Sequence, residues 1–295
     1  LQSQGWRVAL LNRGYRSQRE DGGAAVMSDG QRVLLSAEEG GDEACLMARS
    51  LPGIPVLVGR KRALGGRLAV ERFGTQVLIL DDGFQHWQLY RDLDIVLVDG
   101  TNPFGNGHVL PRGILREPME QLGRADAFII TKGDQITQDR AEAIAAKLRQ
   151  YNPAAPVAMA IHKPSSCLAF AAWHDGKDHG SGALQPDGQS VLAVSALGNP
   201  ASFERTLADA GFTVAGSLRY EDHHHYSRDD IRHMAARAAE TGCLLVTTEK
   251  DAVKLPAPLI KEYDLPLYVL SITIEFTAGQ DQIDTILQAV LEDKL

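Results

Sequence analysis

The sequence has few cysteines and no paired cysteine motif. Its three cysteines, Cys45, Cys167 and Cys243, lie far apart, so they predict neither a disulfide framework nor the spacing of a structural zinc site. This favours a reducing compartment. No apolar run approaches the roughly 20 residues that a membrane-spanning helix needs. The net charge of -8 argues against a nucleic-acid binder held by overall basicity.

A second absence concerns nucleotide binding. The sequence has no Gly-Lys-Ser or Gly-Lys-Thr tripeptide, which in a P-loop holds nucleotide phosphates. The chain opens with "LQSQGWRVALLNRGYRS", which reads as the end of a helix followed at once by a strand over residues 7–11. We therefore expect a further segment to precede Leu1 in the complete protein.

Short apolar runs recur along the first half of the chain. Their shortness and their β-branched residues predict buried strands at residues 8–11, 56–58, 77–80, 95–98 and 127–131. Helical patterns lie between several of these runs, for example over residues 42–50 and 137–151. This alternation predicts a mostly parallel, doubly wound α/β sheet.

The pattern changes near residue 157. A loop rich in Gly, Asp and Pro is followed by a second strand and helix alternation. We predict a core lobe over residues 1–160, a hinge or hairpin over 161–190, and a second α/β lobe with a C-terminal helix over 191–295. A cleft that closes about this hinge would exclude water from a reacting group.

Aspartates follow two of the predicted strands. Asp81 and Asp82 come directly after residues 77–80, and Asp99 follows residues 95–98. Ligands of open α/β sheets collect at the carboxyl ends of the strands, and Mg²⁺ prefers oxygen donors. The alternative is that each aspartate caps a turn.

Two loops carry further polar groups. The Gly-rich residues 99–118 include Arg112, Arg116 and Glu117 and could approach an anion closely, unless the segment is an ordinary loop. Residues 220–231 contain "DHHH", which could be a metal site, the source of a catalytic histidine, or a solvated turn.

Three shorter signals are weaker. Asp42 stands where a helix begins, so it could be only a first-turn residue that the helix dipole favours. Lys250 could meet a phosphate. The tetrapeptide "TKGD" at residues 131–134 is similar to the base-reading motif of GTPases, with Thr in place of Asn.

Taken in order, the polar segments closely resemble those of the tetraacyldisaccharide 4'-kinases, the lipid A disaccharide kinases. The resemblance extends from Asn12 to Leu255. It is carried by "NRGYRS", "GGDEACLMARSLPGIPVLVGRKR", "LILDDGFQH", "DIVLVDGTNPFGNGHVLPRGILREP", "RADAFIITK", "ALGNPASFERTL", "YEDHHHY" and "TTEKDAVKL".

The resemblance implies a role for each matching position. Asp42 would be the catalytic base, His223 would pair with it, and Arg116 would neutralise charge on the phosphoryl group. The other positions would hold Mg²⁺ (Asp81, Asp82), lie beside the nucleotide (Gln85, His86), or contact the lipid substrate (Asn12, Arg13, Gly14, Tyr15, Arg16, Glu43).

The resemblance also implies a P-loop NTPase-like lobe plus a smaller α/β lobe, with ATP and Mg²⁺ as cofactors. The expected partners are lipid A disaccharide 1-phosphate and the cytoplasmic face of the bacterial inner membrane, with no nucleic acid. In this family the phosphate loop and an N-terminal membrane-associating helix precede the position of Leu1. We therefore expect an N-terminally truncated chain that alone binds ATP poorly.

Some interpretations stay open at this point. The basic residues Arg60, Lys61, Arg62 and Arg67 could face anionic headgroups or form a solvated helix face. Another P-loop NTPase, such as a GTPase, and a metal-binding protein built around "DHHH" are the alternatives to the kinase.

Overall fold

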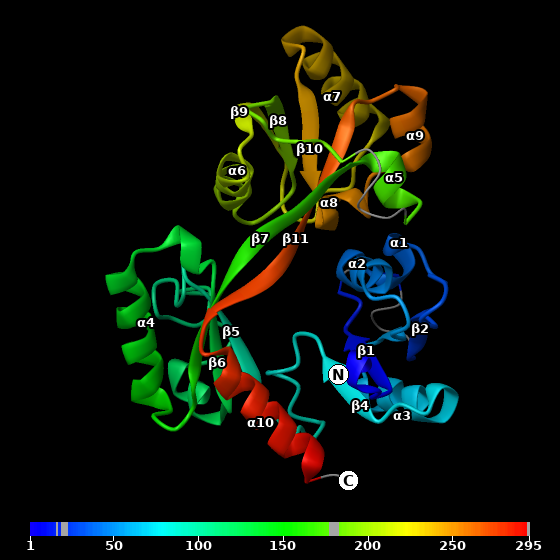
Figure 1. Cartoon of the computed structure of the whole chain (residues 1–295). Coiled ribbons are helices and arrows are strands. Elements are labelled where there is room, and N and C mark those ends of the chain that lie inside the picture. Colours follow the sequence, from blue (N-terminus) through cyan, green and yellow to red (C-terminus); the bar gives the residue numbers. More distant parts are fainter. Residues whose placement is uncertain (16, 19–22, 177–182, 294–295) are drawn as a thin grey trace. The chain divides into compact units, whose positions relative to one another are not determined.

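The computed structural model describes residues 1–15, 17–18, 23–176 and 183–293 (Figure 1). Arg16 and residues 177–182 of the expected hinge therefore lie outside the described residues. The strands are β1 (Val8–Asn12), β2 (Ala25–Ser28), β3 (Val56–Val58), β4 (Val77–Leu80), β5 (Ile95–Asp99), β6 (Ala127–Thr131), β7 (Val157–Ala169), β8 (Ser190–Ser195), β9 (Thr213–Arg219), β10 (Leu244–Thr248) and β11 (Leu267–Ala278).

The α-helices alternate with these strands. They are α1 (Ala37–Gly40), α2 (Asp42–Ser50), α3 (Arg62–Phe73), α4 (Gln138–Tyr151), α5 (Phe170–His174), α6 (Pro200–Asp209), α7 (Arg228–Thr241), α8 (Glu249–Ala252), α9 (Ala257–Glu262) and α10 (Gln280–Glu292). Short 3-10 helices lie at Gln2–Gln4, Met119–Arg124 and Gly133–Gln135. Among the described residues, no helix has the length and apolar character required to cross a membrane.

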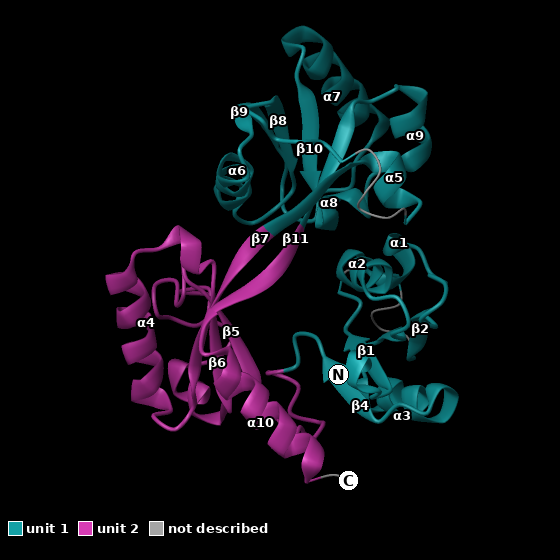
Figure 2. Ribbon diagram, viewed as in Figure 1, with its two compact units in different colours: residues 1–83, 164–271 teal, residues 84–163, 272–295 magenta. Residues whose placement is uncertain are grey.

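The chain forms two compact units, each assembled from two stretches of sequence (Figure 2). Unit 1 contains residues 1–83 and 164–271, and unit 2 contains residues 84–163 and 272–295. This division differs from the lobes expected over residues 1–160 and 191–295, because β7 and β11 each continue from one unit into the other.

The first part of unit 1 is built on a four-stranded sheet in the order β2-β3-β1-β4. β1 is parallel to β3 and β4, and β2 is antiparallel to β3. Successive residues of β1 point to opposite faces, so Leu10 packs with Ala44 of α2 while Leu11 packs with Ala69 of α3. Burial on both faces explains why this strand reads as a continuous apolar run.

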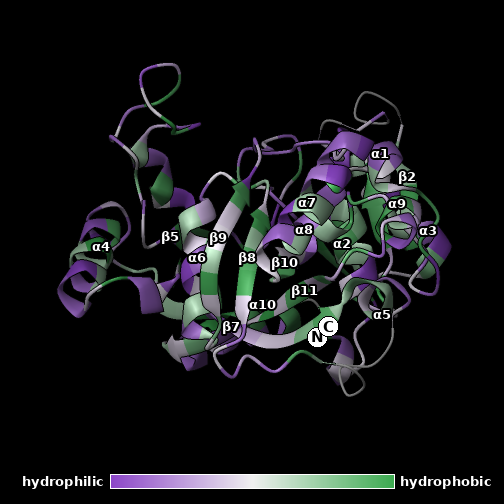
Figure 3. Ribbon diagram, turned by 90° about the horizontal axis from the view of Figure 1, so that it is seen from above, coloured by the Kyte–Doolittle hydropathy of each residue, from purple (hydrophilic) through white to green (hydrophobic). Residues whose placement is uncertain are grey.

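The second part of unit 1 contains the neighbouring strands β11-β10-β8-β9, and each strand is parallel to the next in this order. Leu192 and Val194 of β8 pack with Met234 of α7, and Val191 packs on the opposite face with Leu207 of α6. In Figure 3, α7 carries both hydrophilic and hydrophobic residues, as expected of a helix with one side on a sheet.

Unit 2 contains the parallel strands β5, β6 and β7. Phe128 of β6 packs with Leu148 of α4, and Ile129 packs on the other face near Ile283 of α10. The mostly parallel α/β fold predicted from the sequence is confirmed, and each strand predicted in the first half is present within one residue of its expected bounds.

Candidate active site

The first feature of the candidate site is a contact between two residues 181 positions apart. Asp42 is the first residue of α2, and its Oδ2 lies 3.1 Å from Nδ1 of His223. The other oxygen, Oδ1, accepts a hydrogen bond of 3.0 Å from the backbone N–H of Glu43. Both side chains are largely buried, so their contact is partly shielded from water.

The loop that carries His223 is held by its own aromatic and ionic contacts. His223 has a φ of +64°, a left-handed conformation that is costly for a residue with a side chain. The neighbouring His224 stacks on Tyr220 and places its Nε2 3.0 Å from Oδ2 of Asp230 in α7. These contacts of the next residue fix the backbone that aims His223 at Asp42.

The carboxyl end of β1 adds the second feature. Asn12 is buried, and its Nδ2 donates a 2.5 Å hydrogen bond to Oδ2 of Asp81, which follows β4. Its Oδ1 accepts a 2.6 Å hydrogen bond from the backbone N–H of Gly14. Tyr15 then meets the ring of His223 edge to face, with the ring centroids 5.9 Å apart. The segment thus links the aspartates after β4 to the Asp42–His223 pair.

Two glycines allow this segment to lie against the start of α2. Gly14 and Gly41 have φ values of +69° and +98°, which favour glycine. A Cβ on Gly41 would lie 3.3 Å from Cα of Gly14, and a Cβ on Gly14 would lie 3.2 Å from the carbonyl oxygen of Gly40. The backbones therefore approach more closely than side chains would permit.

A group of carboxylates surrounds Asp81. Burial raises the pKa of Asp81, and the nearby carboxylates Glu43 and Asp82 raise it further, while the hydrogen bond from Asn12 and the charge of Arg62 act in the opposite direction. Crowded, partly buried carboxylate oxygens are the donors that a hard divalent cation stabilises. Asp81 and Asp82 therefore offer oxygen donors of the kind that Mg²⁺ prefers, although no three His, Cys, Asp or Glu side chains among the described residues are grouped so as to hold a metal ion.

Arg62 corrects one expectation from the sequence. It was grouped with Arg60, Lys61 and Arg67 as a possible headgroup-binding face, but its side chain is buried and donates a 2.8 Å hydrogen bond to the carbonyl oxygen of Gly59. Burial lowers the pKa of Arg62, and Asp81 raises it. Arg62 is thus a buried positive charge beside the carboxylates, whereas the other three residues are exposed.

Three predicted site residues belong to unit 2. Arg116 is exposed in the loop after β5, and Gln85 and His86 follow the strand that carries the aspartates. Within the described residues, the buried side-chain oxygen of Gln85 accepts no hydrogen bond. Their roles at the phosphoryl group and the nucleotide are predictions from the family resemblance.

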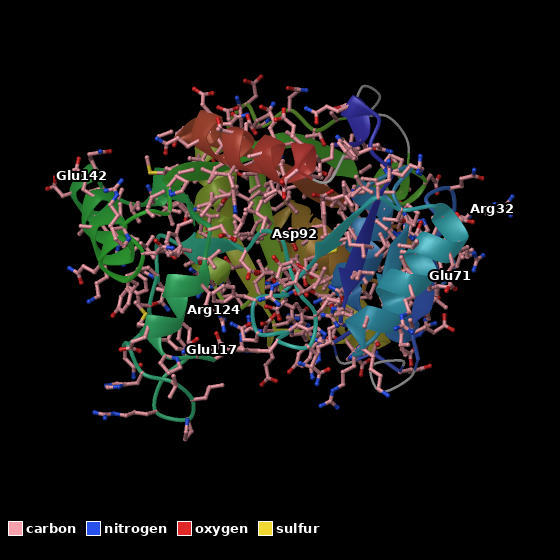
Figure 4. All side chains as sticks on the ribbon, turned by 90° about the horizontal axis from the view of Figure 1, so that it is seen from below. Arg32, Glu71, Asp92, Glu117, Arg124 and Glu142 are labelled. Atoms are coloured by element: carbon pink, nitrogen blue, oxygen red, sulfur yellow. The ribbon has the colours of Figure 1, made fainter. Side chains whose placement is uncertain are left out.

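Two of the ion pairs in unit 2 involve acidic residues noted in the sequence analysis. Arg124 donates a 2.7 Å hydrogen bond to Glu117, and both residues are labelled in Figure 4. The guanidinium of Arg124 lies over the rings of Phe84 and Trp87. Lys132 of "TKGD" lies 2.6 Å from Oδ2 of Asp99. Asp99 is therefore paired with a lysine at the end of its strand.

The histidine-rich loop does not form a metal centre among the described residues. No three His, Cys, Asp or Glu side chains there form a group that could hold a metal ion. His223 and His224 face different carboxylates, Asp42 and Asp230, and His225 is exposed.

The partners of Lys250 were not predicted from the sequence. Its Nζ lies 3.3 Å from Oε1 of Glu43 and 3.8 Å from Oδ1 of Asp222. The sequence signal was its place directly after the strand β10 in "TTEKDAVKL". Its acidic partners could not be identified, because they come from segments distant in sequence.

Comparisons with known proteins identify the family. The family model described as tetraacyldisaccharide-1-P 4'-kinase matches residues 1–292. A tetraacyldisaccharide 4'-kinase of Anaeromyxobacter dehalogenans is 43% identical over 289 residues, which covers 97% of this chain and 74% of the relative. One from Halothermothrix orenii is 40% identical over 283 residues, covering 93% of this chain and 74% of the relative.

A solved structure agrees with these relatives. The crystal structure of LpxK from Aquifex aeolicus in complex with ATP superimposes with a TM-score of 0.70 and 27% sequence identity, covering 98% of this chain and 80% of that one. The family matched by the sequence and the fold matched by the structure are the same. The chain belongs to the tetraacyldisaccharide-1-P 4'-kinase family.

Proposed function

We propose that this protein transfers the γ-phosphoryl group of ATP to the 4'-hydroxyl of tetraacyldisaccharide 1-phosphate, a step in lipid A biosynthesis. Membership of the family supports this reaction, and the ATP complex of the Aquifex aeolicus relative supports the nucleotide. The single observation on this chain that carries the proposal is the pairing of Asp42 with His223 at 3.1 Å.

Asp42 acts as the general base of this reaction. Its Oδ2 accepts the proton of the 4'-hydroxyl while the hydroxyl oxygen bonds to the γ-phosphorus and the bond from phosphorus to the bridging oxygen of ADP breaks. His223 orients the carboxylate through the 3.1 Å contact and shares the proton that Asp42 acquires.

Asp81 and Asp82 hold Mg²⁺ in this proposal, with Asn12 orienting Asp81 through its 2.5 Å hydrogen bond. When bound, the ion neutralises charge on the phosphate oxygens. Arg116 adds positive charge at the phosphoryl group, and Gln85 and His86 lie beside the nucleotide.

The acceptor binds beside the Asp42–His223 pair, which is called the dyad below. Asn12, Arg13, Gly14, Tyr15 and Glu43 contact the lipid substrate in this proposal, and the edge-to-face contact of Tyr15 with His223 supports the location. Because this acceptor carries acyl chains, we propose that the enzyme works at the cytoplasmic face of the inner membrane as a peripheral protein.

The test is a 4'-kinase assay on tetraacyldisaccharide 1-phosphate with Mg²⁺ and ATP, with the family's phosphate-loop segment fused before Leu1. Removal of a general base lowers kcat by about 10²- to 10⁴-fold, and we expect this of Asp42→Ala. Asp281→Ala is the matched control, because Asp281 also stands in the first turn of a helix but is exposed.

Two results would contradict the proposal. Equal activity of the Asp42→Ala and Asp281→Ala variants would show that Asp42 is not the general base. A preference for GTP over ATP as phosphoryl donor would favour a different class of P-loop enzyme.

A further inference from the structure

Lys250 touches the immediate neighbour of each member of the dyad. Its Nζ lies 3.3 Å from Oε1 of Glu43, which follows Asp42, and 3.8 Å from Oδ1 of Asp222, which precedes His223. One lysine thus joins the start of α2 to the histidine loop at the same point where the dyad joins them.

The charges explain why a cation is needed there. Three carboxylates, Asp42, Glu43 and Asp222, meet where these two segments approach each other, and Asp222 also lies 4.0 Å from Nε2 of His223. Like charges this close repel, and the repulsion is weakly screened where side chains are partly buried. Lys250, whose side chain is 25% exposed, places its ammonium group against a carboxylate from each of the two segments.

The backbone of Lys250 is firmly anchored. The next residue, Asp251, is fully buried, and its Oδ2 accepts hydrogen bonds from the backbone N–H of Ala196 and the hydroxyl of Thr248. Val253, one turn later, packs against the cluster that contains Cys45 of α2. The ammonium group therefore projects from a fixed support.

We propose that Lys250 is a positioning residue for phosphoryl transfer, which sets the separation of Asp42 and His223 by holding Glu43 and Asp222. This inference rests on the proposed role of the dyad. In it, Lys250 contributes to kcat through the geometry of the base and does not itself bind the acceptor or ATP.

The decisive variant is Lys250→Met, which removes the charge and keeps much of the length. A misplacement of about 1 Å can cost 10²-fold in rate, and we expect partial loosening to lower kcat by about 10-fold. The KM values for ATP and for the acceptor stay within about 2-fold in this expectation, because Lys250 itself contacts neither substrate and Glu43 keeps its place in the first turn of α2. Lys250→Arg restores most of the rate.

A second variant tests the histidine-loop side of the contact. Asp222→Asn weakens the attraction to Lys250, and we expect it to lower kcat by about 3-fold, with little further loss in the double variant with Lys250→Met. Lys261→Met is the matched control, because it removes an exposed lysine from α9 in the same unit. We expect it to leave kcat unchanged.

The outcomes separate this inference from the proposed function. A raised KM for the acceptor with kcat retained would overturn it in favour of a direct substrate contact. Unchanged kinetics of Lys250→Met, failure of arginine to rescue, or an equal loss in Lys261→Met would also overturn it. An active Asp42→Ala variant would instead refute the proposed function, whatever Lys250→Met does.

Discussion

Replacing Lys254 by methionine removes one half of a buried ion pair in unit 1. Nζ of Lys254 lies 2.9 Å from Oδ1 of Asp251, and the side chains are 6% and 0% exposed. The other oxygen of Asp251 accepts 3.1 Å and 2.9 Å hydrogen bonds from the backbone of Ala196 and the hydroxyl of Thr248. Lys254→Met therefore leaves a buried carboxylate with two neutral donors and no counter-charge.

The expected cost follows from this environment. Breaking a buried pair by removing one partner costs about 3–5 kcal/mol, because an uncompensated charge stays behind. The two remaining donors place Lys254→Met near the lower end, at about 3 kcal/mol. For a folding unit of this size, that corresponds to a fall in the melting temperature of about 6–12 °C. Burial and the charge of Asp251 raise the pKa of Tyr226, whose ring lies 5.7 Å from Nζ of Lys254, so this tyrosine stays neutral and adds no second negative charge beside Asp251.

Urea unfolding measures this cost locally. Trp173 donates a 3.2 Å hydrogen bond to Glu249 of α8, so its fluorescence reports on this region once the other two tryptophans are replaced by phenylalanine. Lys254→Met, Asp251→Asn and the double variant complete a double-mutant cycle. We expect the double variant to be more stable than the sum of the single losses predicts. A loss below about 1 kcal/mol in Lys254→Met, or strictly additive losses, would refute the reasoning.

Three further predictions concern the ends of the other strands. Burial raises the pKa of Asp81, so the folded protein is stabilised while Asp81 is protonated and loses that stability as the pH rises through the raised pKa. Asp81→Asn, which is never charged, should therefore raise the melting temperature more at pH 7 than at pH 4. Equal effects at both pH values would contradict this. Burial alone would raise the pKa of Asp99, but the hydrogen bonds from Lys132 and Thr101 outweigh burial and lower that pKa. Lys132→Met should therefore destabilise the folded protein at pH 7, and the loss should shrink as the pH falls through the lowered pKa. Thermal melts at several pH values measure this. Gly14→Ala should cost about 1–2 kcal/mol in urea unfolding, because φ is +69° and a backbone carbonyl lies 3.2 Å from the new Cβ, whereas the control Gly23→Ala, with open space around it, should cost less.

The strands of the first half were predictable because their apolar runs are short and bounded by polar residues. Residues 77–80 and 127–131 became β4 and β6 with the expected bounds. β2 was missed, because its four residues lie beside Asp, Gly and Ser and resemble a loop. The helix α7 begins directly after Ser227, whose hydroxyl accepts a hydrogen bond from the backbone N–H of Asp230 in a capping box.

The candidate site shows a different limit. Asp42 lies at the start of a helix and Asp81 lies directly after a strand, so the local sequence pattern was enough to identify both. Contacts between distant segments could not be predicted. No sequence pattern indicates that Lys250 contacts Glu43, or that Arg62 is buried while the neighbouring basic residues are exposed. Such contacts depend on the packing of one element against another, which local propensity does not determine.

The way the chain is divided between its units has a consequence for dissection by truncation or proteolysis. The chain passes between the units at three places, near residues 83, 163 and 271, so each unit consists of two separate stretches of sequence. A single protease cut at any of these crossings releases neither unit, and no single stop codon or start site produces one of them alone. Isolating either unit therefore requires joining two distant stretches with a new linker, and a deletion from one end of the chain removes part of one unit and leaves its other stretch behind.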